Sequence, residues 1–246
     1  MSELSGKRAL VTGGSRGIGA AIALALAEKG ADVAITYERL AERAAEVVRS
    51  VEALGRRGVA IQADSADAAA VKRSVEEAVG ALGGLDILVN NAGIARGGPV
   101  AEASLADIDA LLAVNIRSVV LASQAALAHL PDGGRIVSIG SCLGERVPFG
   151  GVTIYSMTKS ALLSFTRGLA REVGPRGITV NLVQPGSTDT DMNPAEGEQA
   201  DQQRALSALG HFGQPQDIAA AVAFLAGPGA RQITGTTLTV DGGANA

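Results

Sequence analysis

Tyr155 and Lys159 are the residues whose types and spacing point most directly to chemistry. They stand four positions apart, so on a helix their side chains leave the same face one turn apart and share a site. A phenol titrates near pH ~10 in water, and a neighbouring ammonium favours the phenolate and lowers that pKa. Tyr155 is therefore a candidate general acid/base. The alternative, a helix-start tyrosine beside a surface lysine, is common by chance, so the surrounding elements must decide.

Ser141 ends the apolar run 135–141, just ahead of this pair. If the run is a parallel strand, the hydroxyl faces the crevice at the carboxyl edge of the sheet and can bind a substrate oxygen. Cys142 has no histidine near it in the sequence to activate it, so we interpret it as a packing residue. The residues expected to wall the substrate pocket are Ser141, Cys142, Leu143, Phe149 and Ser187.

A glycine-rich turn lies near the start of the chain. The apolar run 9–12 breaks into Gly13-Gly14-Ser15-Arg16-Gly17-Ile18-Gly19, and the helix-forming run 20–28 follows. Such glycines let the backbone approach a diphosphate, whose charge is met by backbone N–H groups and the positive end of the helix. The Gly-x-x-x-Gly-x-Gly spacing alone also fits a plain turn. Its place between a strand and a helix favours a dinucleotide site.

The composition limits the class of protein. The 246 residues are 47% hydrophobic and 19% charged, with a formal charge of −4, so no basic surface for nucleic acid is expected. One cysteine excludes an internal disulfide and leaves too few thiols for a structural zinc, so we expect no metal site. No signal peptide is apparent in residues 1–8, and no run is long enough to span a membrane. We expect a cytoplasmic protein.

Strand-like and helix-like segments alternate along the chain. This alternation predicts an α/β fold, a doubly wound parallel seven-stranded sheet of the Rossmann type, with ligands at the carboxyl ends of its strands. The expected strands are 9–12, 32–37, 58–64, 85–93, 135–141, 178–183 and 236–240, and the expected helices are 20–28, 40–54, 67–82, 104–114, 117–130 and 155–173.

Residues 1–246 are expected to form a single dinucleotide-binding oxidoreductase domain. One segment departs from the alternation: residues of about 187–213 are polar, carry few apolar anchors and follow a strand end. Such a segment is a candidate lid over the site, and a solvated surface excursion is the alternative.

Six motifs occur together and in order: Thr12-Gly13-x-x-x-Gly17-x-Gly19, Asn90-Asn91-Ala92-Gly93, Asn115, Ser141, Tyr155-x-x-x-Lys159 and Pro185-Gly186. This set resembles the short-chain dehydrogenase/reductase family over essentially the whole chain. The resemblance implies that Tyr155 is the proton donor/acceptor and that Ser141 orients the substrate carbonyl or hydroxyl. It also implies that Lys159 lowers the pKa of Tyr155 and binds the nicotinamide ribose, while Asn115 supports a water relay to Lys159.

The resemblance further implies a nicotinamide cofactor and a small-molecule ketone or secondary alcohol as substrate. The expected cofactor contacts are Gly13, Ser15, Arg16, Gly17, Ile18, Gly19, Tyr37, Arg39, Asp64, Ser65, Asn91, Ala92, Gly93, Tyr155, Lys159, Pro185, Gly186 and Thr188.

Charge favours NADP(H) over NAD(H). An NAD-selective site of this type places an acidic residue at the end of the second strand, where Tyr37 stands. Arg16 and Arg39 could flank a 2′-phosphate through charge-assisted contacts. Glu38 is a complication, because it could accept a ribose hydroxyl if the turn shifts by one residue. Arg39 could equally be an ordinary surface charge at a helix start.

Segments 169–173 and 176–181 resemble those of bacterial ketoacyl-carrier-protein reductases in the same family. Those enzymes tend to carry basic residues just ahead of the Gly-Arg-Ile turn, for docking of an acidic carrier. Pro131 and Asp132 occupy that place here, which speaks against carrier docking, although Arg176 is retained.

A second function stays open. Segments 174–179, 188–195 and 211–215 are similar to a bacterial branch of the family that includes cyclic-di-GMP-binding proteins, in which the fold senses a nucleotide and catalysis is secondary. The complete catalytic set favours an enzyme. The family usually forms tetramers through the helices 117–130 and 155–173, so we also expect a homotetramer.

Overall fold

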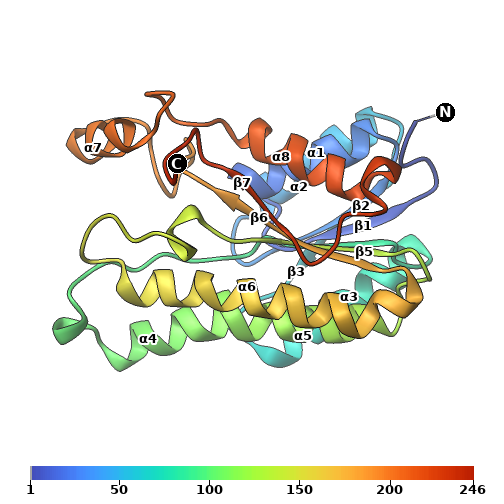
Figure 1. Ribbon diagram of the computed structural model, residues 1–246. Coiled ribbons are helices and arrows are strands. Elements are labelled where there is room, and N and C mark those ends of the chain that lie inside the picture. Colours follow the sequence, from blue (N-terminus) through green and yellow to red (C-terminus); the bar gives the residue numbers. More distant parts are fainter. Residues whose placement is uncertain (1) are drawn as a thin grey trace.

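The structure of the chain is a computed structural model that describes residues 2–246, and only the backbone at 198–199. Its framework is one seven-stranded parallel sheet with the order β3-β2-β1-β4-β5-β6-β7 (Figure 1). The order reverses between β1 and β4, as in Rossmann-type folds, so the predicted fold class is confirmed. The strands are β1 Arg8–Val11, β2 Asp32–Tyr37, β3 Gly58–Gln62, β4 Ile87–Asn90, β5 Arg135–Ile139, β6 Thr179–Pro185 and β7 Thr237–Val240.

Helices cover both faces of the sheet. In Figure 1, α1, α2 and α8 lie above it and α3, α4, α5 and α6 lie below. Their bounds are α1 Gly17–Glu28, α2 Ala41–Ala53, α3 Ala68–Leu82, α4 Leu105–Leu112, α5 Ser118–Leu127, α6 Thr153–Val173, α7 Glu198–Leu206 and α8 Pro215–Ala226.

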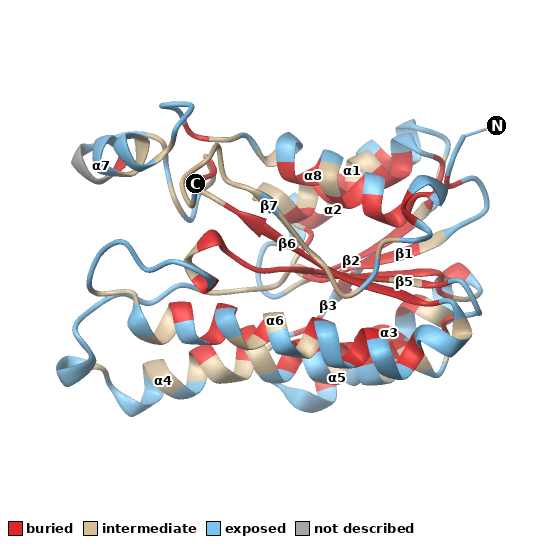
Figure 2. Cartoon of the chain, in the orientation of Figure 1, coloured by how far each residue is buried: buried red, intermediate tan, exposed pale blue. Residues whose placement is uncertain are grey.

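The period of two along each strand divides the core into two layers. On β1, Ala9 and Val11 pack with α1, α2 and α8, whereas Leu10 between them packs with α3, α5 and α6. Figure 2 shows the sheet as a nearly continuous buried band between helices whose outer faces are exposed. Because both faces of the sheet are covered, the inner strands β1, β4 and β5 are mostly apolar runs.

Helix α8 was not expected from the sequence. It begins with Pro215 at its first turn and a capping box in which Gln214 and Asp217 satisfy each other's backbone N–H groups. The run Ile218–Ala226 then packs on α1 and the sheet. The start signal is present in the sequence, directly after the polar segment 187–213, but no helix is predicted there. The observed strands begin and end within three residues of the expected ones.

A π-helical segment, Ala113–Arg117, joins α4 to α5. The sequence predicts two helices, 104–114 and 117–130, with a break between them. The structure instead keeps the helix continuous and inserts a wide turn, a device common at functional sites. Asn115 lies in this wide turn and is 1% exposed.

The carboxyl edge of the sheet gathers the segments with predicted chemistry. The glycine turn follows β1, residues 91–93 follow β4, Ser141 closely follows β5, and residues 186–188 follow β6. Among the residues described, no helix combines the length and apolar character needed to span a bilayer.

Candidate active site

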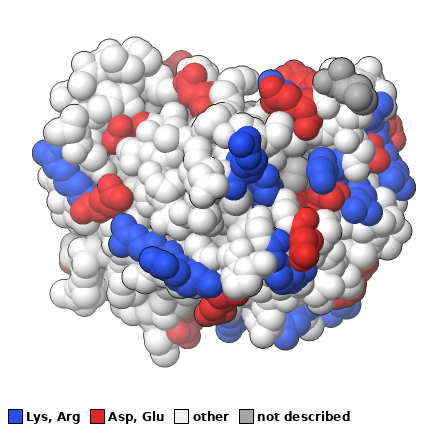
Figure 3. Space-filling view, turned by 45° about the vertical axis from the view of Figure 1, so that its right-hand side comes forward, with Lys and Arg blue, Asp and Glu red and all other residues white. Residues whose placement is uncertain are grey.

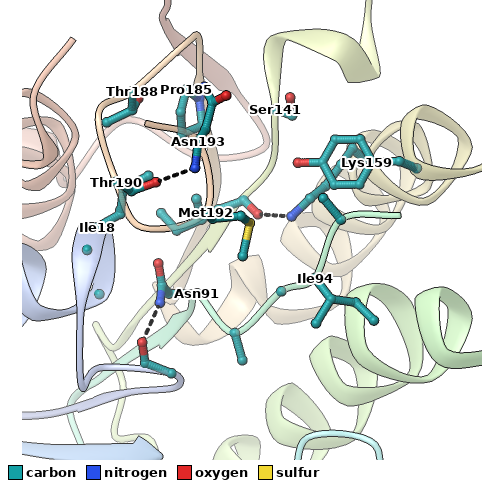
Figure 4. A pocket seen from close by; sticks show the side chains of 18 of the residues that line it. Ile18, Asn91, Ile94, Ser141, Lys159, Pro185, Thr188, Thr190, Met192 and Asn193 are labelled. Atoms are coloured by element: carbon teal, nitrogen blue, oxygen red, sulfur yellow. Dashed lines mark hydrogen bonds between the residues drawn. The ribbon is translucent and has the colours of Figure 1, made fainter. Parts of the chain in front are cut away.

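Tyr155 and Lys159 lie in the first turns of α6, beside the carboxyl end of β5. Lys159 Nζ is 5.8 Å from the centroid of the Tyr155 ring. It donates a hydrogen bond to the carbonyl oxygen of Ile139, 3.1 Å away (Figure 4). Only 5% of Lys159 is exposed, so its ammonium is held away from bulk water. Burial lowers the pKa of Lys159 to about 8, because the charged form loses hydration.

The phenol of Tyr155 is shifted in the opposite sense to the prediction. Burial raises the pKa of Tyr155, and a hydrogen bond with the Ser141 hydroxyl only partly opposes this. The sequence predicts a pKa lowered by Lys159, but Nζ donates to the Ile139 carbonyl, and the partial burial of Tyr155 in the cavity wall disfavours the charged phenolate. The phenol is therefore protonated at neutral pH, which is the form that can donate a proton to a ketone.

Ser141 occupies the position that the sequence predicts, just beyond the carboxyl end of β5. Its backbone is extended, and its Oγ accepts a hydrogen bond from the backbone N–H of Leu143 at 3.2 Å. Figure 4 places Ser141 and Lys159 at the same end of the cavity. Ser141 can thus hydrogen-bond a substrate oxygen that the Tyr155 phenol also reaches.

Asn115 acts behind the cavity wall. Its Oδ1 accepts from Ile94 N at 2.9 Å, and its Nδ2 donates to Ile94 O at 2.9 Å and to Thr158 Oγ1 at 3.1 Å. Thr158 in turn donates to the carbonyl oxygen of Tyr155 at 2.7 Å. The chain of contacts ties the π-helical segment to the turn of α6 that carries the pair. Thr158 is not among the predicted site residues, although its place just before Lys159 on α6 is a usable signal.

The glycine turn is held by the ends of three strands. Gly13 has φ +64° and Gly17 has φ +53°, conformations that favour glycine. Gly13 N donates to Thr36 Oγ1 at 2.9 Å, and Asn91 Nδ2 donates to the carbonyl oxygen of Gly13 at 3.0 Å. The turn leads directly into α1, whose first residue is Gly17, so the backbone N–H groups at the start of α1 remain free to meet an anion.

Gly19 makes the closest approach in this turn. A Cβ there would overlap the carbonyl oxygen of Gly13 and Nδ2 of Asn91. We expect Gly19→Ala to destabilise the fold by ~1–3 kcal/mol, the usual cost of forcing atoms into a packed site. Thermal unfolding measures this change. The matched control is Gly80→Ala in α3, where a Cβ meets nothing within 4 Å. If both variants unfolded alike, the turn would not be tightly packed.

The end of β2 carries the charges that bear on cofactor choice. Tyr37 is its last residue, and Arg39 Nε pairs with Glu38 Oε1 at 2.8 Å, with 85% of the Arg39 side chain exposed. Arg16 instead reaches Asp191. Glu38 is thus engaged by the neighbouring arginine in this arrangement.

One cavity of about 900 Å³ runs along the carboxyl edge, from the glycine turn to the Tyr155–Lys159 pair. All the predicted cofactor and substrate residues line it, and of the predicted catalytic residues only Asn115 does not. The predicted residues that line it are Gly13, Ser15, Arg16, Gly17, Ile18, Gly19, Tyr37, Arg39, Asp64, Ser65, Asn91, Ala92, Gly93, Ser141, Cys142, Leu143, Phe149, Tyr155, Lys159, Pro185, Gly186, Ser187 and Thr188.

The segment 187–213 forms part of this cavity's wall. Gln203, on α7, joins two points of the segment: its Oε1 accepts from Ser187 Oγ at 2.7 Å and from Asn193 Nδ2 at 2.9 Å. Thr190 and Asn193 pair through their backbones and leave Asp191 and Met192 at the tip of the turn. Figure 4 shows Met192 directed into the cavity, between the pair on α6 and the glycine turn.

A family model described as "Enoyl-(Acyl carrier protein) reductase" matches residues 13–245. The match runs from the glycine turn to Asn245, and both ends of the match line the cavity. The chain belongs to the short-chain dehydrogenase/reductase family. Membership in this family makes it an oxidoreductase by class, and the resemblance seen in the motifs is confirmed.

Three relatives illustrate the range of this family around the chain. A short-chain dehydrogenase from Burkholderia cenocepacia J2315, crystallised with NADP, is 64% identical with a TM-score of 0.98, over 99% of this chain and 100% of that one. The cyclic-di-GMP-binding biofilm dispersal mediator protein of Escherichia coli K12 is 45% identical over 98% of both chains. The 3-oxoacyl-[acyl-carrier-protein] reductase of Staphylococcus aureus Mu50 is 42% identical over 96% and 97%.

In this short-chain dehydrogenase/reductase, the side chain of Arg176 stabilises the end of α5. Its Nη1 donates to the carbonyl oxygen of Leu127 at 3.0 Å, its Nη2 donates to that of Leu130, and its Nε lies 3.4 Å from Asp132. These bonds satisfy carbonyls at and just beyond the end of α5 and occupy the guanidinium. Retention of Arg176 is therefore no sign of carrier docking.

Residues far apart in the sequence meet in the wall of the cavity. Asn245 Nδ2 donates to the carbonyl oxygen of Cys142 at 2.8 Å, and Arg146 Nη1 donates to that of Ala244 at 2.8 Å. The sequence carries no local signal for contacts across about a hundred residues. Burial raises the pKa of Cys142 to about 11, so its thiol stays protonated and packs in the wall, as we interpreted it.

Proposed function

We propose that the chain is an NADP(H)-dependent oxidoreductase that interconverts an uncharged, apolar ketone and its secondary alcohol. The observation that carries the proposal is the convergence of Ser141, Tyr155 and Lys159 at one end of a cavity that begins at the glycine turn. The cofactor, when bound, supplies or accepts the hydride. The chain's own residues supply the proton and the positioning.

The cavity fits a dinucleotide. The glycine turn and the free N–H groups of α1 suit a diphosphate, and Gly19 lets the start of α1 pack closely against the glycine turn. Asp64 and Ser65 line the adenosine end. Lys159, with Pro185, Gly186 and Thr188, lines the nicotinamide end.

In this proposal, Tyr155 gives its phenolic proton to the carbonyl oxygen in reduction and takes it back in oxidation. Ser141 holds that oxygen by a hydrogen bond. Lys159 binds ribose hydroxyls and, as a cation, favours the phenolate when the alcohol is oxidised. Asn115 and Thr158 fix the turn of α6 on which Tyr155 stands.

The choice of NADP(H) rests on charge. The end of β2 carries Tyr37 where an NAD-selective site of this family has a carboxylate. Arg16 stands in the glycine turn, where its guanidinium can meet a 2′-phosphate. The Burkholderia relative was crystallised with NADP, which agrees with this assignment.

The substrate end of the cavity supports an apolar, uncharged substrate. Leu143, Phe149 and Met192 line it, and the nearby cation Arg96 has its Nε 3.3 Å from Asp107. A carboxylate or acyl-phosphate group would find no free cation there among the residues described, apart from Lys159, which the ribose takes. With Asp132 beside Arg176, the surface also gives no reason to expect an acidic carrier.

The test is a panel of ketones assayed by the loss of NADPH absorbance. We expect aryl-alkyl and alkyl ketones to be reduced, and keto acids and carrier-bound ketoacyl groups to be poor substrates. Reduction of none of them would argue against the proposed enzyme. Titration with cyclic-di-GMP, run beside the panel, tests the alternative that the chain is a nucleotide sensor, which the Escherichia coli relative's name favours.

Domain organisation, compartment and partners follow from the same features of the chain. We infer that residues 1–246 act as one domain, with the 187–213 segment as its lid, because all the strands share one sheet. A free, buried Cys142 suits a reducing cytoplasm. In Figure 3, Asp and Glu side chains stand beside the Lys and Arg side chains, and the formal charge of the chain is −4, which speaks against nucleic acid as a partner.

We expect a homotetramer. Exposed apolar side chains lie on the helices below the sheet: Leu105 on α4 is 71% exposed, Val120 on α5 40% and Met157 on α6 50%. Burial of such surfaces in closed symmetry is the usual outcome. Light scattering should give four times the mass of the chain. Val120→Lys should lower that mass, whereas Leu54→Lys, at the end of α2, should not. A monomeric wild type would contradict this expectation.

A further inference from the structure

Two arginines converge on one carboxylate oxygen above the glycine turn. Asp191, at the tip of the 187–213 segment, accepts from Nη1 of Arg43 and, at 3.4 Å, from Nη1 of Arg16, and both bonds reach its Oδ2. The arginines come from separate elements, Arg16 from the glycine turn and Arg43 from the first turn of α2. An anionic oxygen is thus held between two cations that the fold brings together.

Arg16 and Arg43 lie at the adenosine end of the cavity. Arg16 lines the cavity, and Arg43 stands one helical turn beyond Arg39 and Leu40, which line it too. Arg39 Nε pairs with Glu38, whereas Arg43 shares the Asp191 carboxylate with Arg16. Each of the two guanidiniums uses one nitrogen for Asp191, and a guanidinium has five N–H donors, so both have donors left for another anion.

The contact of Asp191 with Arg16 and Arg43 also attaches the tip of the 187–213 segment to the glycine turn and α2. Thr190, next to Asp191, lies over the glycine turn, where a Cβ on Gly17 would be 3.4 Å from its Cγ2. The hydrogen bonds with Arg43 and Arg16 keep the pKa of Asp191 below its usual value, so the carboxylate is charged at neutral pH. Any anion that draws Arg16 and Arg43 away from Asp191 therefore removes one of the attachments of this tip.

We propose that Asp191 is a built-in counter-anion for the cofactor's 2′-phosphate: the carboxylate and the phosphate compete for Arg16 and Arg43, so that Asp191 weakens discrimination in favour of NADP(H) and the phosphate loosens the 187–213 segment. This inference rests on the proposed use of NADP(H). Its sign follows from charge. Two guanidiniums facing Asp191 carry a net charge of +1, and without the carboxylate they carry +2, which attracts a phosphate more strongly.

Binding measurements test the competition. Dissociation constants for NADPH and NADH come from cofactor fluorescence at low salt. We expect Asp191→Asn to tighten NADPH binding by ~2- to 5-fold, the scale of an exposed charge pair, and to leave NADH nearly unchanged. Arg43→Gln should weaken NADPH by a similar factor. Arg49→Gln, which removes the same charge about 9 Å further along α2, is the matched control and should change neither constant.

Hydrogen exchange tests the effect on the segment without turnover. Adenosine 2′,5′-bisphosphate and AMP differ only by the 2′-phosphate. We expect the bisphosphate, compared with AMP, to speed amide exchange around residues 189–193 in the wild type, and to lose this effect in Asp191→Asn. Slower exchange, or no difference between the two nucleotides, would overturn the proposal.

Binding data distinguish an error in the cofactor assignment from an error in the counter-anion role of Asp191. A wild type that binds NADPH no better than NADH would show that the cofactor assignment is wrong. A wild type that prefers NADPH, with an Asp191→Asn variant whose preference is unchanged or lower, would refute the counter-anion alone.

Discussion

A Tyr155→Phe variant is expected to reduce ketones ~10²–10⁴-fold more slowly than the wild type, the usual contribution of a positioned proton donor. Phenylalanine keeps the ring and its packing and removes only the hydroxyl. Because burial raises the pKa of Tyr155, the wild-type phenol is protonated at neutral pH and ready to donate. The variant must take the proton from a less well placed donor. Single-turnover NADPH oxidation on the best ketone of the panel measures the loss.

The control for this variant is Ser156→Ala. Ser156 is the next residue on α6 and is buried, and within the described part of the chain its hydroxyl has no hydrogen-bond partner. Removing that hydroxyl should leave turnover close to wild type. NADPH binding by Tyr155→Phe should also be nearly unchanged, which separates a lost proton from a lost cofactor. Turnover of Tyr155→Phe near the wild-type rate would show that another group donates the proton.

A Lys159→Met variant is expected to become more stable and less active. The pKa of Lys159 falls from 10.5 to about 8 on folding, so the unfolded chain binds more protons between those values. Wild-type stability therefore rises with pH from about 8 to above 10 through this group, and below pH 8 the buried charge costs on the order of 3 kcal/mol. Methionine removes that cost, so the unfolding temperature at neutral pH should rise.

The activity of Lys159→Met in alcohol oxidation should fall. Alcohol oxidation needs the Tyr155 phenolate, which Lys159 and the oxidised nicotinamide both favour through their positive charge. Oxidation by the wild type should increase with pH, and in Lys159→Met the rising limb should lie at higher pH because the nearest cation is gone. Cofactor binding should weaken as well. Profiles of oxidation rate against pH at saturating cofactor measure the shift.

Two results would contradict the role given to Lys159. An active Lys159→Met variant with an unshifted oxidation limb would show that Lys159 does not tune Tyr155. A variant less stable than the wild type at neutral pH would show that the hydrogen bond to Ile139, and not the cost of burying the charge, dominates this position. Thermal melts at pH 7 and above 10 distinguish the hydrogen bond from the cost of burying the Lys159 charge, because that cost disappears at the higher pH.

Local spacing determines much of this protein before it folds. The four-residue interval between Tyr155 and Lys159 places both on one face of α6, and the glycines from Gly13 to Gly19 predict a turn between a strand and a helix. Strands buried on both faces must be apolar runs, so their alternation with helices predicts the doubly wound sheet. The carboxyl ends of such strands share one edge, which is why nearly every predicted site residue lines one cavity.

Only the tertiary structure decides which distant residues meet and how far each is removed from water. Asp191 reaches Arg16 and Arg43 across about 150 residues or more, and Asn245 reaches Cys142, because packing of the whole chain sets those distances. The pKa of Tyr155 rises where spacing alone predicts a fall. The four-residue spacing indicates that a cation lies near Tyr155. The loss of hydration that raises the pKa depends on every atom packed around the phenol.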